Sequence, residues 1–112
     1  MPIENWSDNI LMVELQDDPA FTDDVNALQE QVGERDDVDV VLNFAGVNYL
    51  NSSNLAKLLK LRKKLHANGR KLVLCGVDTN VWGIFMVTGL DKVFRFEDNL
   101  ANALASVQIA AQ

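Results

Sequence analysis

Apolar and polar positions along this chain follow two different spacings. Nearly unbroken apolar runs are typical of strands buried on both faces of a sheet. Such runs lie at residues 10–15, 38–44 and 72–77. Elsewhere apolar residues recur every three or four positions, which indicates amphipathic helices. These helices are predicted at residues 19–33, 53–67, 80–88 and 100–107. Two short strands complete the pattern, one around Trp6 and one at residues 93–96.

The first two helices carry clear apolar faces. The face of the first is made by Phe21, Val25, Leu28 and Val32. The face of the second is predicted to be Leu55, Leu58, Leu59 and Leu65, flanked by Leu61. Arg62 falls inside this apolar arc, and we expect its side chain to snorkel past the edge of the sheet.

Residues that start or stop helices stand at the predicted boundaries. Asp18 is a suitable N-cap for the first helix, with Pro19 in its first turn. Asp78 can cap the third helix, and Asp98 or Asn99 the last. The stop residues are Gly33, Asn68-Gly69 and Gly89.

The regular alternation of strands and helices predicts an α/β layer fold with a largely parallel sheet. No linker, repeat or low-complexity segment interrupts residues 1–112, so we expect a single domain. The strands at 38–44 and 72–77 are apolar enough to be central. Binding sites in such sheets gather at the carboxyl ends of the strands.

One loop at such a strand end carries the most informative residues. Residues 48–54 read Asn-Tyr-Leu-Asn-Ser-Ser-Asn and join the strand at 38–44 to the second helix. Ser52 and Ser53 therefore lie where a helix begins, and free backbone N–H groups and the helix dipole favour an anion there. Either the serines cap the helix without regulation, or one of them accepts a phosphate.

The composition is that of an ordinary globular domain, and it excludes several functions. The net charge of −6 argues against nucleic-acid binding. No apolar run approaches the roughly 20 residues of a membrane span, and the first residues do not form a signal peptide. The single cysteine, Cys75, lies in an apolar run and fits a buried thiol. We expect a cytoplasmic protein.

Charge is distributed unevenly along the chain. Residues 1–40 hold twelve acids and one base, Arg35, whereas residues 57–71 hold seven bases and no acid. A solvated helix face is the simpler interpretation of the basic stretch. The alternative is a surface that steers a charged protein partner.

Motifs for self-contained chemistry are missing. The glycines form neither a dinucleotide fingerprint nor a P-loop, and no G-x-S-x-G elbow surrounds the serines. With one histidine, His66, and one cysteine, the chain offers no zinc ligand set. Residues 36–39 (Asp-Asp-Val-Asp) fit a polar loop, and Trp82, Phe85 and Met86 fit a core or an interface. We expect no enzyme activity, no cofactor and no metal.

Four segments in order resemble the sulfate transporter and anti-sigma factor antagonist (STAS) domain family. They are residues 40–55, with Gly46-Val47 and the double serine, and residues 68–75, 88–94 and 98–104. The resemblance covers about residues 8–108 and implies a small mixed, mostly parallel sheet of four to five strands with about four helices.

The resemblance also implies a function. In stand-alone bacterial members, a partner serine kinase that is itself an anti-sigma factor phosphorylates the second serine of the motif, and a cognate phosphatase reverses this. Ser53 matches that serine, and Ser52 is the second choice. The expected partner-binding residues are Asn51, Ser52, Ser53, Asn54 and Lys57.

The chain departs from the family pattern at two positions. Asn51 replaces the usual aspartate, which is expected to weaken phosphorylation, and Asn54 replaces the usual glycine, which is expected to crowd a partner. These changes favour a second hypothesis, an unphosphorylated scaffold or an accessory subunit of a lipid-transporting ABC complex or a stress-signalling particle. A third hypothesis, a sensor of a small ligand or nucleotide, rests on family analogy alone.

Overall fold

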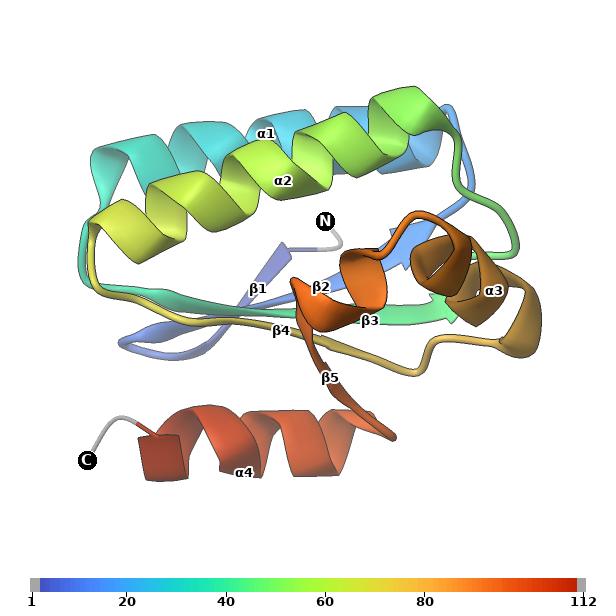
Figure 1. Ribbon diagram of the computed structural model, residues 1–112. Helices are drawn as coiled ribbons and strands as arrows, with labels where there is room; N and C mark the ends of the chain where they lie inside the picture. The colour runs from blue at the N-terminus through green and yellow to red at the C-terminus, as the bar shows by residue number, and fades with distance from the viewer. Residues whose placement is uncertain (1–2, 111–112) are drawn as a thin grey trace.

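A five-stranded sheet forms the middle layer of the molecule (Figure 1). The fold was analysed in a computed structural model that describes residues 3–110. The strands are β1 (Ile3–Ser7), β2 (Ile10–Gln16), β3 (Asp39–Gly46), β4 (Leu72–Cys75) and β5 (Arg95–Glu97). The helices are α1 (Ala20–Glu34), α2 (Ser52–Ala67), α3 (Thr79–Val87) and α4 (Leu100–Ala110), with a 3-10 turn η1 (Leu90–Lys92).

The strands lie side by side in the order in which they occur in the sequence. β1 pairs antiparallel with β2, and every other neighbouring pair is parallel. β3 is the central strand, as its apolar run predicted, and Leu42 pairs with Val13 on one side and Leu74 on the other. The prediction of a mixed, mostly parallel α/β sheet is confirmed.

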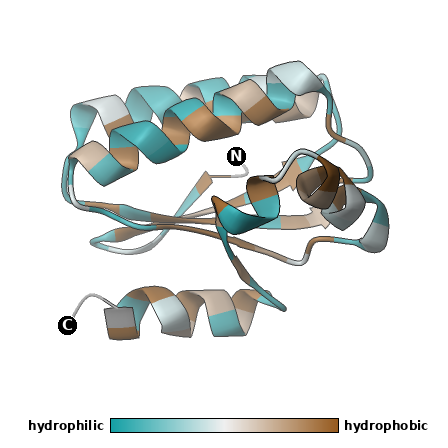
Figure 2. Cartoon of the chain, in the orientation of Figure 1, coloured by the Kyte–Doolittle hydropathy of each residue, from teal (hydrophilic) through white to brown (hydrophobic). Residues whose placement is uncertain are grey.

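Helices cover both faces of the sheet. In Figure 1, α1 and α2 lie together on one face and α4 lies alone on the other, while α3 sits near the carboxyl ends of the parallel strands. The larger core lies under α1 and α2, where the rings of Phe21, Phe44 and Phe85 meet edge to face. The smaller core lies under α4 and includes Val41, Val73 and Cys75. Figure 2 shows the apolar strands between helices of mixed polarity.

The buried face of α2 differs from the predicted one. Leu61 is fully buried, whereas Leu59 is 38% exposed. At about 3.6 residues per turn, steps of three, three and four keep Leu55, Leu58, Leu61 and Leu65 on one side of the helix. The prediction that Leu59 belongs to this face is therefore wrong. None of the helices within residues 3–110 has the length and apolar character needed to cross a membrane.

Two predicted boundaries are also corrected. Gly33 does not end α1, which continues through Glu34. A Cβ at residue 33 would lie 3.0 Å from Nζ of Lys64, so the glycine leaves room for the end of this lysine side chain. The last strand begins at Arg95 rather than residue 93, because the chain first forms η1 after Gly89, which has a φ of 76°.

The large apolar residues of α3 divide between the core and the surface. Phe85 is fully buried, but Trp82 is 37% and Met86 55% exposed. The Trp82 ring packs edge-on against Phe96 with their centroids 5.0 Å apart. α3 is thus an apolar helix that the domain covers only in part.

Candidate functional site

The loop between β3 and α2 lies at the carboxyl edge of the parallel strands, where the sequence placed it. Its ends are anchored by two buried apolar side chains, Val47 and Leu50. Between them Asn48 and Tyr49 are exposed, and Tyr49 keeps 64% of its surface in solvent. Ser52 and Ser53 follow as the first two residues of α2, and both are exposed.

Asn51, not a serine, is the N-cap of α2. Its Oδ1 accepts a hydrogen bond from the backbone N–H of Asn54 at 2.8 Å, and Oδ1 of Asn54 accepts one from the backbone N–H of Asn51 at 3.0 Å. This reciprocal capping box satisfies two donors at the start of the helix. The alternative in which Ser52 and Ser53 cap the helix is therefore wrong.

The carboxylate of Asp18, in the link between β2 and α1, accepts a hydrogen bond from this capping box. Nδ2 of Asn54 donates to Oδ2 of Asp18 at 2.9 Å. Oδ1 of Asp18 accepts from the hydroxyl of Thr22 at 2.7 Å and from its backbone N–H at 2.8 Å. The hydrogen bonds from Thr22 and then Asn54 lower the pKa of Asp18 from its usual 3.8.

The prediction that Asp18 is the N-cap of α1 with Pro19 in the first turn is wrong by one residue, because the helix begins at Ala20 with Pro19 in the N-cap position. The carboxylate of Asp18 still accepts a backbone N–H of the first turn, that of Thr22. The side chain of Asn54 is turned inward, because the residue is only 2% exposed. Its amide fills a position inside the domain rather than projecting toward a partner.

Asp17 holds the other half of the loop. Its Oδ1 accepts from the backbone N–H of Asn48 at 2.8 Å and of Tyr49 at 3.3 Å. Its Oδ2 accepts from Nδ2 of Asn48 at 3.0 Å. The side-chain and then the backbone hydrogen bond from Asn48 lower the pKa of Asp17. Two successive carboxylates thus fix the loop that presents the serines.

Sequence reasoning missed the role of Asp17 and treated Asp18 only as a cap. A signal was present, because both follow β2 directly. The carboxyl ends of adjacent parallel strands meet at one edge of a sheet. Polar side chains after β2 and after β3 are therefore expected to be neighbours.

The helix start and two lysines favour a negative charge at Ser53, whereas the carboxylate of Asp18, hydrogen-bonded to the next residue, opposes it. No acid occupies the first turn of α2, whose free N–H groups and dipole are positive. Ser53 also borders a shallow hollow of about 300 Å³ between α1 and α2 that is lined by Lys57 and Lys60. The backbone carbonyl oxygen of Lys57 accepts a hydrogen bond from Nε2 of Gln29 at 3.2 Å, which joins this turn of α2 to α1. Lys57, an expected partner-binding residue, is thus placed beside Ser53.

The other reactive side chains lie apart from this loop. Cys75 is fully buried in the core under α4, and burial raises the pKa of its thiol to about 11. His66 is exposed in the last turn of α2, at the opposite end of the helix from Ser53. Serine, histidine and cysteine are therefore not assembled into one site.

The sequence and the fold both have known relatives. The family model for the STAS domain matches residues 5–103. The anti-sigma F factor antagonist of Paenibacillus polymyxa is 26% identical over 84 residues, which is 75% of this chain and 72% of that protein.

Solved structures share the fold at low sequence identity. A variant of RsbS from Moorella thermoacetica superposes with a TM-score of 0.83 at 18% identity, covering 98% of this chain and 96% of that one. The phosphorylated form of the Bacillus cell fate determinant SpoIIAA gives 0.72 at 16% identity, covering 93% and 95%. A chain of the stressosome, described as a signal integration and transduction hub, gives 0.77 at 18%, covering 99% of both chains.

Proposed function

The chain belongs to the STAS domain family, and from this membership we propose that it is a binding module of the anti-sigma factor antagonist type, switched by phosphorylation of Ser53. A partner serine kinase that is also an anti-sigma factor adds the phosphate, and a cognate phosphatase removes it. The observation that carries the proposal is the position of Ser53, exposed at the second residue of α2 and not needed as a cap.

The domain can accept a phosphate at this position without unfolding. A phosphoserine carries about −1.5 to −2 charges at neutral pH. A negative charge at an exposed helix start is worth about 0.3–1 kcal/mol, and Lys57 and Lys60 border the same hollow. The phosphate is therefore tolerated in the free protein, which is what a reversible switch requires.

A bound partner responds differently to the same phosphate. We expect the unmodified loop to dock against the partner with Tyr49, Ser52 and Ser53, three of its exposed residues. An acidic or closely packed partner surface repels the added charge at a cost of several kcal/mol. Because about 1.4 kcal/mol corresponds to a tenfold change in affinity, one phosphate is sufficient to release the partner.

The two departures from the family pattern are compatible with this switch. Asn51 supplies the cap, so the start of α2 is ordered without an aspartate. Asn54 is buried against Asp18, so its contribution to partner binding is to hold the loop rather than to touch the partner.

The test compares two neighbouring serines. Phosphopeptide mass spectrometry on the protein from its own cells is expected to find phosphate on Ser53, together with a co-purifying serine kinase. Ser53→Asp is expected to lose that kinase, whereas Ser52→Asp, which places the same charge one residue earlier, is the matched control. An unmodified Ser53 under growth and stress, or kinase binding undiminished in Ser53→Asp, overturns the proposal.

One observation favours a constitutive scaffold as the second candidate. The amides of Asn51 and Asn54 hold the loop in one conformation with no modification. A scaffold of this kind binds its partner equally well with serine, alanine or aspartate at position 53. Co-purification of a transporter ATPase in place of a kinase identifies the accessory-subunit form of this candidate.

A further inference from the structure

A basic groove lies at the opposite end of α2 from Ser53. It has a volume of about 630 Å³ and is formed by the last turns of α2, the loop into β4 and the residues around the start of β5. Its charged or ionisable lining residues are Arg62, His66, Arg70, Lys71 and Arg95. No acid lines it, although the chain as a whole carries a net charge of −6.

Most of these bases have no ionic partner in the domain. Within residues 3–110 the ion pairs are Arg35–Asp37 and Arg70–Asp39. Arg62, Lys71 and Arg95 therefore face the groove with uncompensated charge. The groove thus concentrates unpaired basic side chains in a protein of net negative charge.

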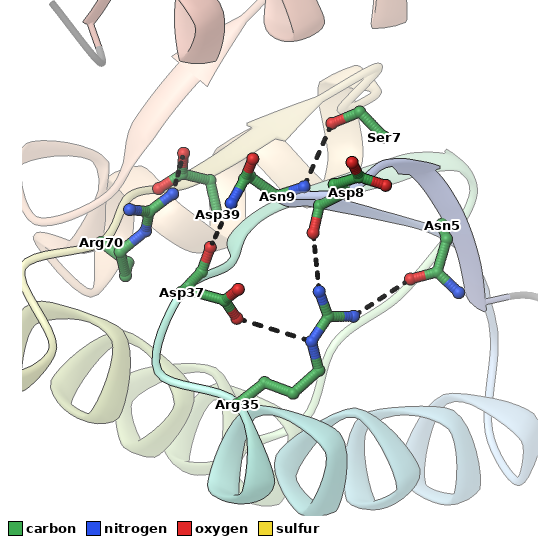
Figure 3. A network of polar contacts seen from close by, with 8 residues as sticks. All are labelled: Asn5, Ser7, Asp8, Asn9, Arg35, Asp37, Asp39 and Arg70. Carbon is green, nitrogen blue, oxygen red and sulfur yellow. Dashed lines mark hydrogen bonds and ion pairs between the residues drawn. The ribbon is translucent and has the colours of Figure 1, made fainter.

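Arg70 is held in place rather than neutralised fully. Its Nη2 lies 3.1 Å from Oδ2 of Asp39, which is only 4% exposed (Figure 3). Oδ1 of Asp39 accepts the backbone N–H of Lys71 at 2.9 Å, so one carboxylate fixes two consecutive residues of the rim. Nε of Arg70 is buried without a hydrogen-bond partner among the described residues.

Helix-end electrostatics explain only part of the cluster. Bases in the last turn of a helix complement the negative end of its dipole, and the effect fades beyond that turn. This accounts for His66 and the residues just after α2. It does not account for Arg62, which lies more than one turn before the end of α2, or for Arg95 on β5.

The geometry favours dispersed carboxylates over a compact phosphate. Compact anions are typically held by converging backbone N–H groups at a helix start, whereas this groove is at the end of α2 and is lined by separate basic side chains. The bases come from α2, a loop and β5, and they surround an apolar floor of Leu72 and Phe94. A peptide segment with several acids and an apolar side chain matches each of these features.

We propose that this groove binds an acidic segment of a protein partner. The inference goes beyond the proposed function, because the groove is separate from the loop that carries Ser53. Ser53 borders the hollow between α1 and α2, whereas the groove lies on the side of α2 that faces β4 and β5. The two surfaces are also about 20 Å apart along the helix axis, since Ser53 and His66 are thirteen residues apart.

The experiment measures peptide binding to the full chain by fluorescence anisotropy. The probe is a fluorescein-labelled peptide of about ten residues made of glutamate and leucine, and the reference is the same peptide with glutamine for glutamate. We expect binding of the acidic peptide alone, and we expect it to be lost in 1 M salt, where the screening length is about 3 Å.

A matched pair of variants locates the site. Arg62→Gln with Arg95→Gln removes two charges from the groove, and Lys63→Gln with Lys92→Gln removes two exposed charges elsewhere. We expect about tenfold weaker binding in the groove variant, equivalent to about 1.4 kcal/mol, and less than about twofold in the control. Circular dichroism checks that both are folded.

Three outcomes overturn the inference. These are no binding of the acidic peptide, equal weakening in both variants, and displacement of the peptide by inorganic tripolyphosphate at lower concentration than by unlabelled peptide. The last outcome makes the groove a phosphate site. Peptide binding requires no kinase and is expected to persist in Ser53→Asp. Its failure is therefore distinguishable from a failure of the phosphorylation switch.

Discussion

Nδ2 of Asn54 lies 2.9 Å from Oδ2 of Asp18, and this hydrogen bond between residues 36 apart in the sequence joins the starts of α1 and α2. The same Asp18 caps α1 through Thr22, and the same Asn54 closes the capping box of α2. α1 and α2 are therefore fixed to each other at the point where α2 presents its serines. A substitution of Asp18 or Asn54 is therefore expected to alter the loop that carries Ser53.

Asn54→Ala is expected to destabilise the domain by about 1–2 kcal/mol. The substitution removes one half of the capping box and the bond to Asp18, and it leaves the backbone N–H of Asn51 without its acceptor. Urea unfolding measures the change. Asn102 provides a matched control, because it is an exposed asparagine at the equivalent position of α4. Asn102→Ala is expected to change the free energy of unfolding by less than about 0.5 kcal/mol.

Mutations are expected to show that Asn51 stabilises the domain and that Ser53 does not. Asn51→Ala removes the N-cap and is expected to cost about 1 kcal/mol of unfolding free energy. Ser53→Ala is expected to change it by less than about 0.5 kcal/mol, because Ser53 is exposed and Asn51 already caps the helix. Thermal unfolding of the two variants provides the comparison. An equal loss of stability in both would show that Ser53 is a structural residue.

Much of this architecture was readable from the sequence, because local rules and the global fold agree. The large apolar side chains of β2, β3 and β4 and the four-residue face of α1 are buried as predicted, although β4 ends at Cys75 rather than at Val77. Asp78 and Asn99 accept backbone N–H groups at the starts of α3 and α4. The loop with Ser52 and Ser53 lies at the strand edge where the alternation of strands and helices placed it.

The details that escaped prediction depend on contacts between distant segments. Asp39 was grouped with a polar loop, but it is buried because Arg70 and the backbone of Lys71 reach it from 31 and 32 residues away. Arg35, the single base among the early acids, donates to the backbone carbonyl of Asp8 at 2.7 Å and joins α1 to the β1–β2 hairpin (Figure 3). The pattern of apolar and polar residues within one segment cannot predict such contacts between distant segments.

The corrected face of α2 yields a second matched pair. Leu61 is fully buried and Leu59 is 38% exposed, although only one residue separates them in the sequence. Leu61→Ala leaves a cavity in the main core and is expected to cost about 2–5 kcal/mol. Leu59→Ala is expected to cost less than about 1 kcal/mol, because most of the loss from a buried leucine is absent there. Denaturant unfolding of both variants under the same conditions measures the two losses of unfolding free energy. Equal losses would contradict the observed burial of Leu61 and exposure of Leu59.

Asp17 and Asp24 are expected to give opposite pH responses. Hydrogen bonds from Asn48 lower the pKa of Asp17 in the folded state, so ionised Asp17 stabilises the domain above its usual pKa of 3.8. That stability is lost as the pH falls through the lowered folded-state value. Asp17→Asn is therefore expected to be less stable than the parent near neutral pH, with the difference shrinking below about pH 3.8.

Asp24 on α1 supplies the contrast, because burial and then the charge of Asp23 raise its pKa. A carboxyl group with a raised folded-state pKa contributes stability that is present below its unfolded pKa and lost as the pH rises through the folded value. Asp24→Asn is thus expected to be more stable than the parent near neutral pH, with the advantage disappearing in acid. Urea unfolding of the parent and both variants from pH 7 to pH 3 measures the two trends. Trends of the same sign would show that the loop is not held by the ionised carboxylate of Asp17.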